Sequence, residues 1–297
     1  MAHSFWGLHA DGPMARQQVR YSGRPRLELH MAPTSDSKSP GCLAERVAVI
    51  SGGAQGIGRA VATRFQWEGA RVFILDCDDP SGQKTAAELT EQNPPLPVTF
   101  VPVDLQHPKE IREAMQAVSQ IHRRVDVLVN NAGIEREKPL QQLLVEDWDA
   151  ILNINLRGAF LLTQAALPFF PQSGGAIVNI SSIHATHAFP DSIPYACSKA
   201  GLVALTRNLA LELAPLRIRV NCVCPGYIDT RLWDEYLRNS PDPQALADHT
   251  TALHPLGRRG MPADVSEAAL FFASESSSFV TGTHLVVDGG LTLRAHP

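Results

Sequence analysis

The chain has 297 residues, of which 44% are hydrophobic, and a formal net charge of −4 at neutral pH. A chain of this length can bury one substantial core, so a single catalytic domain is enough to account for it. The mild acidic balance produces no field that would draw the protein to nucleic acid. The five cysteines are odd in number and lack metal-ligand spacing, which favours a reducing compartment and predicts no metal site. No run approaches the roughly eighteen apolar residues of a membrane span, so we expect no membrane association.

Residues 1–40 show no sustained hydrophobic period and contain many Gly, Pro and Ser residues, so we interpret them as a flexible N-terminal extension. Four arginines lie between Asp11 and Glu28 with no acid among them, a feature of organellar presequences. Interspersed Gly and Pro residues would interrupt an amphipathic helix there. We therefore expect a cytoplasmic protein, with a mitochondrial location as the alternative, and assign residues 41–297 to the folded domain.

From Arg46 onward, short β-rich runs alternate with segments of helical length. The first run, Val47–Ile50, enters a glycine cluster and then a predicted helix over Gly56–Glu68. Nearly continuous apolar strands separated by helices predict a parallel sheet with helices on both faces, the doubly wound α/β (Rossmann) architecture. Such sheets bind ligands at the carboxyl ends of their strands. The further predicted strands are Arg71–Asp76, Val98–Val103, Val125–Asn130, Ala176–Ser181, Ile218–Cys224 and His284–Asp288.

The glycine cluster Ser51–Gly58 has the context that a dinucleotide-binding fingerprint requires, because it follows a strand and opens a helix. Glycines permit a tight turn and let a pyrophosphate approach the backbone amides at the positive end of the helix. The spacing is Gly-x-x-x-Gly-x-Gly instead of the commoner Gly-x-Gly-x-x-Gly. A plain strand-to-helix turn therefore stays the alternative interpretation of the cluster alone.

Asp76 closes the second predicted strand, where a carboxylate can accept hydrogen bonds from the adenosine ribose and would repel a 2′-phosphate. Positions 55 and 77 hold Gln and Cys, not an Arg or Lys that would neutralise the Asp76 carboxylate. The pattern therefore predicts NAD over NADP. Asp104, at the end of the third strand, is a candidate partner for the adenine amino group, with an ordinary turn acid as the alternative. The amides and glycine of Asn130–Gly133 suit a tight turn joined to neighbouring strands.

Tyr195 and Lys199 lie four residues apart, which places a phenol and an ammonium on the same face of a helix. A fixed cation beside a phenol favours the phenolate, so Tyr195 is the candidate acid/base. The spacing alone is weak evidence, because it arises by chance in many helices. Its weight comes from the other motifs of the chain.

Together, these motifs resemble the short-chain dehydrogenase/reductase family in order and spacing, over about residue 41 to the C-terminus. The resemblance implies that Ser182 binds the substrate oxygen and that Tyr195 exchanges its proton. It implies that Lys199 lowers the Tyr195 pKa and binds the nicotinamide ribose, and that Asn155 holds a water of a proton relay. The thirteen-residue gap to Tyr195 favours Ser182 over Ser181. The motifs that carry the resemblance are Ser51–Gly58, Asn130–Gly133, Asn155, Ser182, Tyr195 with Lys199, and Pro225 with Gly226.

The resemblance also implies NAD as the cofactor and a loop after the sixth strand that contacts the nicotinamide. A substrate lid is expected at about 227–259, with a purely structural helical insertion as the alternative. The expected cofactor contacts are Gly52, Gln55, Gly56, Ile57, Gly58, Asp76, Asp104, Leu105, Asn131, Ala132, Gly133, Tyr195, Lys199, Pro225, Gly226, Ile228 and Thr230.

Residues 232–235, 241–243 and 254–258 are similar to a subgroup that includes L-fucose-type sugar dehydrogenases and a 17β-hydroxysteroid dehydrogenase. This implies hydride transfer between a secondary alcohol of sugar, polyol or hydroxysteroid type and the nicotinamide, with Tyr195 as the acid/base. The alternatives are reduction of a 3-oxoacyl thioester or other carbonyl, against which Asp76 argues, and a non-catalytic cofactor-binding regulatory protein. We expect a small-molecule alcohol or carbonyl substrate and a homo-oligomer, a dimer or tetramer joined through helices near 147–170 and 195–214. The substrate-binding candidates are Glu135, His184, His187 and Trp233, with Phe189 and Tyr227 as further wall residues.

Overall fold

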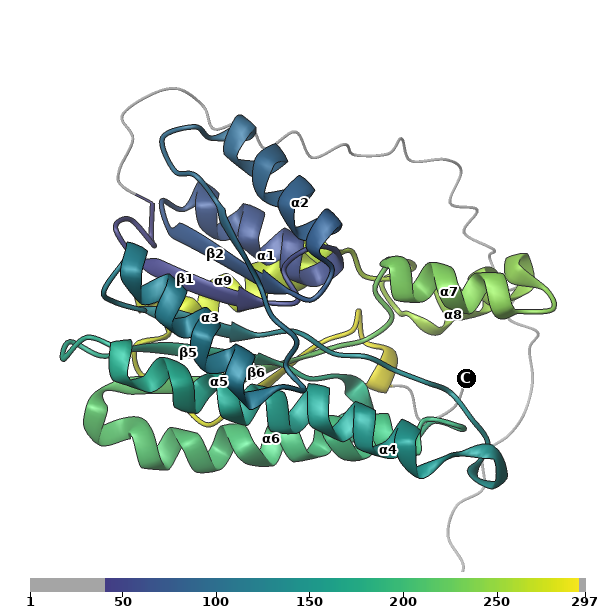
Figure 1. Cartoon of the computed structure of the whole chain (residues 1–297). Helices are drawn as coiled ribbons and strands as arrows, with labels where there is room; N and C mark the ends of the chain where they lie inside the picture. Colours follow the sequence, from purple (N-terminus) through teal and green to yellow (C-terminus); the bar gives the residue numbers. More distant parts are fainter. Residues whose placement is uncertain (1–40, 294–297) are drawn as a thin grey trace, which may run out of the picture. The chain divides into compact units, whose positions relative to one another are not determined.

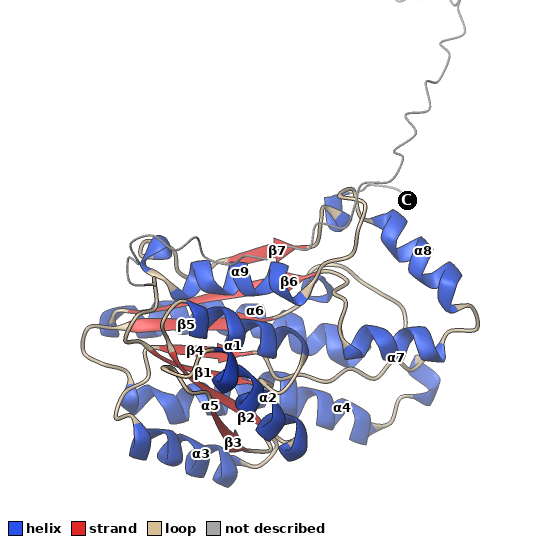
Figure 2. Ribbon diagram, turned by 90° about the horizontal axis from the view of Figure 1, so that it is seen from above, coloured by secondary structure: helices blue, strands red, loops and turns tan. Residues whose placement is uncertain are grey.

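The computed structural model describes residues 41–293, and its described strands form one parallel sheet in the order β3-β2-β1-β4-β5-β6-β7 (Figure 2). The predicted doubly wound α/β fold is confirmed, and the predicted strand boundaries are shifted by at most two residues. The extension predicted for residues 1–40 lies outside the described residues. The strands are β1 (Val47–Ser51), β2 (Arg71–Asp76), β3 (Thr99–Pro102), β4 (Val127–Asn130), β5 (Gly175–Ile180), β6 (Ile218–Pro225) and β7 (His284–Val287).

Helices cover both faces of the sheet, because the strands are apolar on both sides (Figure 1). Consecutive residues of one strand, such as Phe73 and Ile74, point to opposite faces of the sheet and are buried in different cores. Phe65 and Phe272 pack in the core under α1, α2 and α9, and Met115 packs in the core under α3, α5 and α6. The helices are α1 (Gly56–Trp67), α2 (Asp79–Gln92), α3 (Pro108–Ile121), α4 (Val145–Leu152), α5 (Ala159–Ala166), α6 (Ile193–Leu213), α7 (Arg231–Asn239), α8 (Pro243–Leu253) and α9 (Pro262–Ala273).

The strand order reverses direction between β1 and β4, which pair in parallel with Ile50 opposite Val129. Chain segments leaving the two strands diverge to opposite sides at such a point, so a crevice opens at their carboxyl ends. The glycine turn follows β1 and the Asn130–Gly133 segment follows β4, so both border this crevice. Helices α7 and α8 pack against each other in the segment predicted as a lid (Figure 1).

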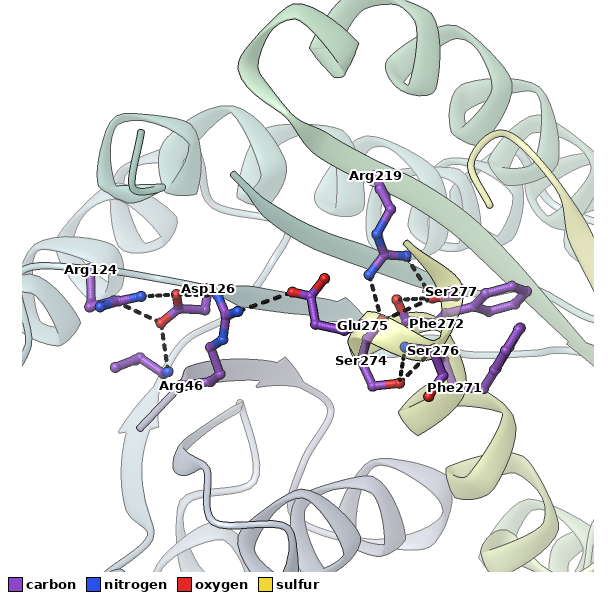
Figure 3. Close-up of polar contacts among 11 residues, drawn as sticks. Arg46, Arg124, Asp126, Arg219, Phe271, Phe272, Ser274, Glu275, Ser276 and Ser277 are labelled. Carbon is purple, nitrogen blue, oxygen red and sulfur yellow. Dashed lines mark hydrogen bonds and ion pairs between the residues drawn. The ribbon is translucent and has the colours of Figure 1, made fainter. Parts of the chain in front are cut away.

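At the amino ends of the strands, the buried carboxylate of Asp126 joins β1 to β4 (Figure 3). It accepts hydrogen bonds from the Val47 amide at 2.9 Å, Arg46 Nη1 at 3.3 Å and Arg124 Nε at 2.9 Å. Arg46 also pairs, at 3.1 Å, with Glu275, a residue just after the end of α9. This network fixes the edge of the sheet opposite the crevice.

One described stretch, Val145–Phe169, is long and apolar enough to cross a membrane by length and composition alone. It contains α4, a π-helical turn over Asn153–Gly158, and α5. Within the domain, α4 packs against α6 and α5 packs against α3, as expected for helices that cover a sheet. The composition of this stretch gives only weak evidence for a membrane span.

Candidate active site

The glycine turn is held in a form that only glycine accommodates at its key positions. Gly52 has φ +65°, and a Cβ there would lie 2.8 Å from the Ala132 Cα. A Cβ at Gly58 would lie 2.0 Å from the Gly52 carbonyl oxygen, so this glycine lets α1 approach the turn. The N-cap residue of α1, Gln55, makes no side-chain cap hydrogen bond, which leaves the first amides of the helix for a ligand.

The segment after β4 is tied to this turn. The Asn131 side-chain amide donates to the Ser51 and Gly52 carbonyl oxygens at 3.0 and 2.9 Å. The Ser51 hydroxyl accepts from the Asn131 and Ala132 amides at 3.1 and 3.2 Å. Asn130 donates to Asn179 of β5 at 2.8 Å. The predicted joining role of Asn130–Gly133 is therefore confirmed.

A cavity of about 360 Å³ follows the glycine turn and the carboxyl ends of the central strands. Four of the expected cofactor contacts lie elsewhere. Gly58 is buried beneath the turn, and Pro225, Gly226 and Ile228 line an adjoining cavity because β6 carries them past the crevice. The expected contacts that line the 360 Å³ cavity are Gly52, Gln55, Gly56, Ile57, Asp76, Asp104, Leu105, Asn131, Ala132, Gly133, Tyr195, Lys199 and Thr230.

One end of this cavity is acidic. Asp76 accepts from the Ala54 amide at 3.0 Å and from the Asp78 amide at 3.1 Å, and both acids line the cavity. Arg231, from the start of α7, also lines it and pairs with Glu235 at 3.3 Å. This arginine lies far from Asp76 in the chain, so the local sequence gave no signal for it. The glycine cradle, the uncapped helix end and a ribose-binding acid together fit a dinucleotide.

Helix α6 brings Tyr195 and Lys199 together, with the lysine Nζ 5.4 Å from the tyrosine ring centroid. The Tyr195 hydroxyl is hydrogen-bonded to Ser182. Lys199 Nζ donates to the Ile180 carbonyl at 2.9 Å. Burial lowers the pKa of Lys199 to about 8.

Desolvation raises the pKa of Tyr195, and the negative charge of Glu135 acts in the same direction. The hydrogen bond from Ser182 acts in the opposite direction and lowers the pKa of Tyr195. The lowering of that pKa that we expected from Lys199 is therefore outweighed in this structure.

Asn155 lies in the π-helical turn between α4 and α5, a distortion that is frequent at functional sites. Its Oδ1 accepts from the Ile134 amide at 2.8 Å, and its Nδ2 donates to the Ile134 carbonyl at 2.9 Å and to Ser198 Oγ at 3.1 Å. A Cβ on Gly133 would lie 3.3 Å from both Asn155 Oδ1 and Lys199 Nζ. Asn155 and Lys199 therefore face the same small space.

Two further cavities lie on the substrate side of Tyr195. The smaller, of about 110 Å³, contains Ser182 and Tyr195, and the larger, of about 600 Å³, lies under the lid helices. His187 lines neither of them, because its side chain turns to solvent and contacts Thr186 at 3.0 Å. Its prediction as a substrate residue is therefore not supported by its position. The candidates that line both cavities are Glu135, His184, Tyr227 and Trp233, and Phe189 lines the larger one.

Glu135 and His184 are the polar groups that connect the two cavities. The Glu135 side chain is 5% exposed and accepts from Ser192 Oγ at 3.2 Å. Burial raises the pKa of Glu135 to about 7, and burial together with the charge of Lys199 lowers the pKa of His184 to about 4. His184 is therefore neutral at neutral pH. Its Nδ1 is buried without a hydrogen-bond partner among the described residues.

Two other residues of this site, Glu137 and Tyr236, were not among the expected substrate contacts. Tyr236 of α7 is hydrogen-bonded to Glu135 and to Glu137, so the lid contacts the segment after β4. The hydrophobic pattern of α7 predicts a helix but not which partner its polar side chains reach. For Tyr236, the sequence therefore offered only the helical period of residues 231–239.

The fold and this site define an oxidoreductase with a doubly wound α/β domain. The family model described as enoyl-(acyl carrier protein) reductase matches residues 52–292. The chain belongs to the short-chain dehydrogenase/reductase family, as the resemblance predicted.

Relatives in this family are similar over most of the chain. A 3-oxoacyl-(acyl-carrier-protein) reductase of Thermotoga maritima is 38% identical over 251 residues, which covers 84% of this chain and 98% of the relative. An L-fucose dehydrogenase of Bos taurus is 36% identical over 251 residues, which covers 84% and 90%. The solved structure of levodione reductase has a TM-score of 0.82 and 29% identity, and the match covers 86% of this chain and all of that one. The chain is therefore an oxidoreductase that acts on an alcohol or a carbonyl.

Proposed function

We propose that the protein is an NAD-dependent dehydrogenase of a secondary alcohol, with Tyr195 as the acid/base. The observation that carries this proposal is the position of Tyr195, which lines both the cavity of the glycine turn and the smaller substrate-side cavity. A proton acceptor at that junction can reach an alcohol placed beside the nicotinamide end of a cofactor. Ser182, bonded to the same phenol, can hold the alcohol oxygen.

The chain's own residues handle the proton. Tyr195 takes the hydroxyl proton of the alcohol, and Ser182 keeps the oxygen in place as its charge changes. Lys199, whose pKa is lowered to about 8 by burial, can pass a proton onward near neutral pH, in the space that it shares with Asn155. NAD, when bound, supplies the hydride acceptor and a positive charge near the reacting groups.

NAD is proposed over NADP because two carboxylates, Asp76 and Asp78, border the adenosine end of the cavity. A 2′-phosphate there would be repelled at close range. Arg231 is the one described basic residue that lines this cavity besides Lys199, and it is already paired with Glu235. The balance at the ribose therefore favours a free 2′-hydroxyl.

A second candidate function is reduction of a 3-oxoacyl thioester or another carbonyl, which the name of the Thermotoga maritima relative favours. Asp76 opposes it, because reductive enzymes of this kind usually draw on NADP. A non-catalytic regulatory protein is the least supported alternative, because the complete set of Asn155, Ser182, Tyr195 and Lys199 lies at the site.

We also propose a homo-oligomer, a dimer or tetramer. Apolar side chains on the outer face of the α4–α5 segment support it: Val145 is 70% exposed, Trp148 37% and Phe160 43%. A cytoplasmic location is proposed because the five cysteines are all free thiols, as in a reducing compartment.

The test is a set of initial rates with NAD and with NADP on polyols, aldoses, hydroxysteroids, amino alcohols and 3-hydroxyacyl thioesters. We expect NADH formation from at least one secondary alcohol and a kcat/KM with NAD at least about ten-fold above that with NADP. Preference for NADP, or turnover of thioesters alone, would replace this proposal with the reductase function.

A further inference from the structure

The larger substrate-side cavity is lined by carboxylates that lack an ion-pair partner among the described Lys and Arg side chains. Glu135, Glu137 and Asp191 line it, and within residues 41–293 none of them forms an ion pair with Lys or Arg. His184 Nδ1 lies 3.9 Å from Glu135 Oε1, and burial together with the charge of Lys199 lowers the pKa of this histidine to about 4. The charge of Lys199 also acts to lower the pKa of Glu135, but burial outweighs it. Burial also raises the pKa of Glu137, and Asp191 adds to that effect. The Glu135 side chain is buried, whereas Glu137 and Asp191 are exposed at the mouth of the cavity. A buried acid without an ion-pair partner is costly, so Glu135 is informative about a ligand.

The arginine and the fourth acid on the cavity wall do not change this balance. Arg136 is held by Asp147 at 2.9 Å. Glu235 is held by Arg231 at 3.3 Å and approached by Arg238 at 3.8 Å. Asp147 also pairs with Lys138 at 2.6 Å. Among the described residues that line the cavity, four acids outnumber one arginine, so the formal charge of its wall is negative.

Aromatic rings form the remainder of the wall. Phe189, Tyr227, Trp233 and Tyr236 follow one another around the cavity, with successive ring centroids 6.4, 5.8 and 6.3 Å apart. Aromatic faces attract cations, and rings combined with carboxylates are the usual surroundings of a bound ammonium group. Trp233 already attracts one cation, since the guanidinium of Arg259 lies 4.8 Å from its ring centroid without lining the cavity.

On the basis of the proposed dehydrogenase function, we propose that the substrate is a secondary alcohol that carries a cationic amine, with Glu135 and Glu137 as its counter-charges. Glu135 lines both substrate-side cavities, so the amine would lie close to the carbinol that faces Tyr195. An anionic substrate would be repelled by the same carboxylates. A neutral polyol could donate hydrogen bonds to these carboxylates but would leave them without a counter-charge.

The same arrangement gives the amine a part in the reaction. The charge of Glu135 opposes ionisation of Tyr195, and an ammonium group beside Glu135 would cancel that effect. A cationic substrate would therefore bind more tightly and would also make Tyr195 easier to deprotonate. A neutral substrate of the same shape would do neither.

The test compares three probes of similar size that carry a cationic, a neutral and an anionic substituent beside the same carbinol: 2-amino-1-phenylethanol, 1-phenyl-1,2-ethanediol and mandelate. All three keep the secondary alcohol. Their binding to the full-length protein saturated with NADH is measured by titration calorimetry at pH 8, above the pKa of about 7 to which burial raises Glu135. We expect the amine to bind about ten-fold more tightly than the diol, and mandelate to bind most weakly.

The variants are Glu135→Gln and Glu137→Gln, each of which should reduce the preference for the amine over the diol. Glu113→Gln is the matched control, because Glu113 is exposed on α3 and pairs only with Lys109 among the described residues. It should keep the preference of the natural protein. A variant that fails to fold is recognised from its circular dichroism, and the probe ranking on the natural protein then decides.

The outcomes separate this inference from the proposed function. Equal or tighter binding of the diol overturns the inference. So does the absence of detectable amine binding at a concentration of about 10 mM. Preferential binding of the amine without NADH formation from NAD supports the cation site and counts against the dehydrogenase function.

Discussion

Replacing Glu135 by glutamine should stabilise the protein, and more so as the pH rises. Burial raises the pKa of Glu135 from 4.5 to about 7, so the folded chain binds this proton more tightly than the unfolded chain. For an acid whose pKa is raised on folding, stability is greatest below the unfolded value and falls as the pH rises through the window between the two values. Above pH 7 the ionised carboxylate costs about 3 kcal/mol, the free energy that corresponds to the difference between the two pKa values.

Glutamine keeps the shape of the side chain and an oxygen that can accept from Ser192, but carries no charge. E135Q should therefore be more stable than the natural protein by about 1 kcal/mol at pH 5.5 and about 3 kcal/mol at pH 8.5. Urea unfolding followed by circular dichroism at the two pH values measures this difference, with Glu113→Gln as the control that should change stability at neither. A stability gain that is the same at both pH values, or a loss at pH 8.5, would refute the reasoning.

Three further predictions concern the sheet edge, the cofactor preference and the glycine turn. Asp126→Ala removes the acceptor of the Val47 amide and of two arginines, and should lower the free energy of unfolding by about 3 kcal/mol; a loss below about 1 kcal/mol would contradict the bridging role. Asp76→Ala should raise kcat/KM with NADP relative to NAD by at least about ten-fold, and an unchanged ratio would show that another group selects the cofactor. Gly58→Ala places a Cβ 2.0 Å from the Gly52 oxygen and should weaken NAD binding more than about ten-fold by fluorescence titration; binding within two-fold of the natural protein would disprove the tight packing.

The fold was predictable because its signals are local and repeated. Strands such as Val47–Ser51 are buried along their whole length, and such runs alternate with helices of 8 to 21 residues. That pattern leaves few architectures other than a parallel sheet with two helical layers. The proposed catalytic set was expected from the family resemblance, because the Tyr195–Lys199 spacing alone is weak evidence. The structure places Tyr195 and Lys199 together on α6, with Ser182 just after β5.

The charge balance of the substrate-side cavities was not predictable. Glu137 and Tyr236 lie about a hundred residues apart, and only the packing of α7 over the segment after β4 brings them together. The effect of burial on Tyr195 was also missed, because the sequence shows the neighbouring Lys199 but not the loss of solvent. The outward position of His187 could not be predicted for a related reason: a loop of this length can turn a side chain either inward or outward.

The most direct test of the account is the effect of Tyr195→Phe, which removes one hydroxyl and leaves the ring that lines both cavities. Turnover of the best secondary alcohol with NAD is measured beside the dissociation constant for NAD. We predict that kcat falls by about 10²- to 10⁴-fold while NAD binding stays within about three-fold of the natural protein. Undiminished turnover with binding intact would contradict the assignment of Tyr195 as the acid/base.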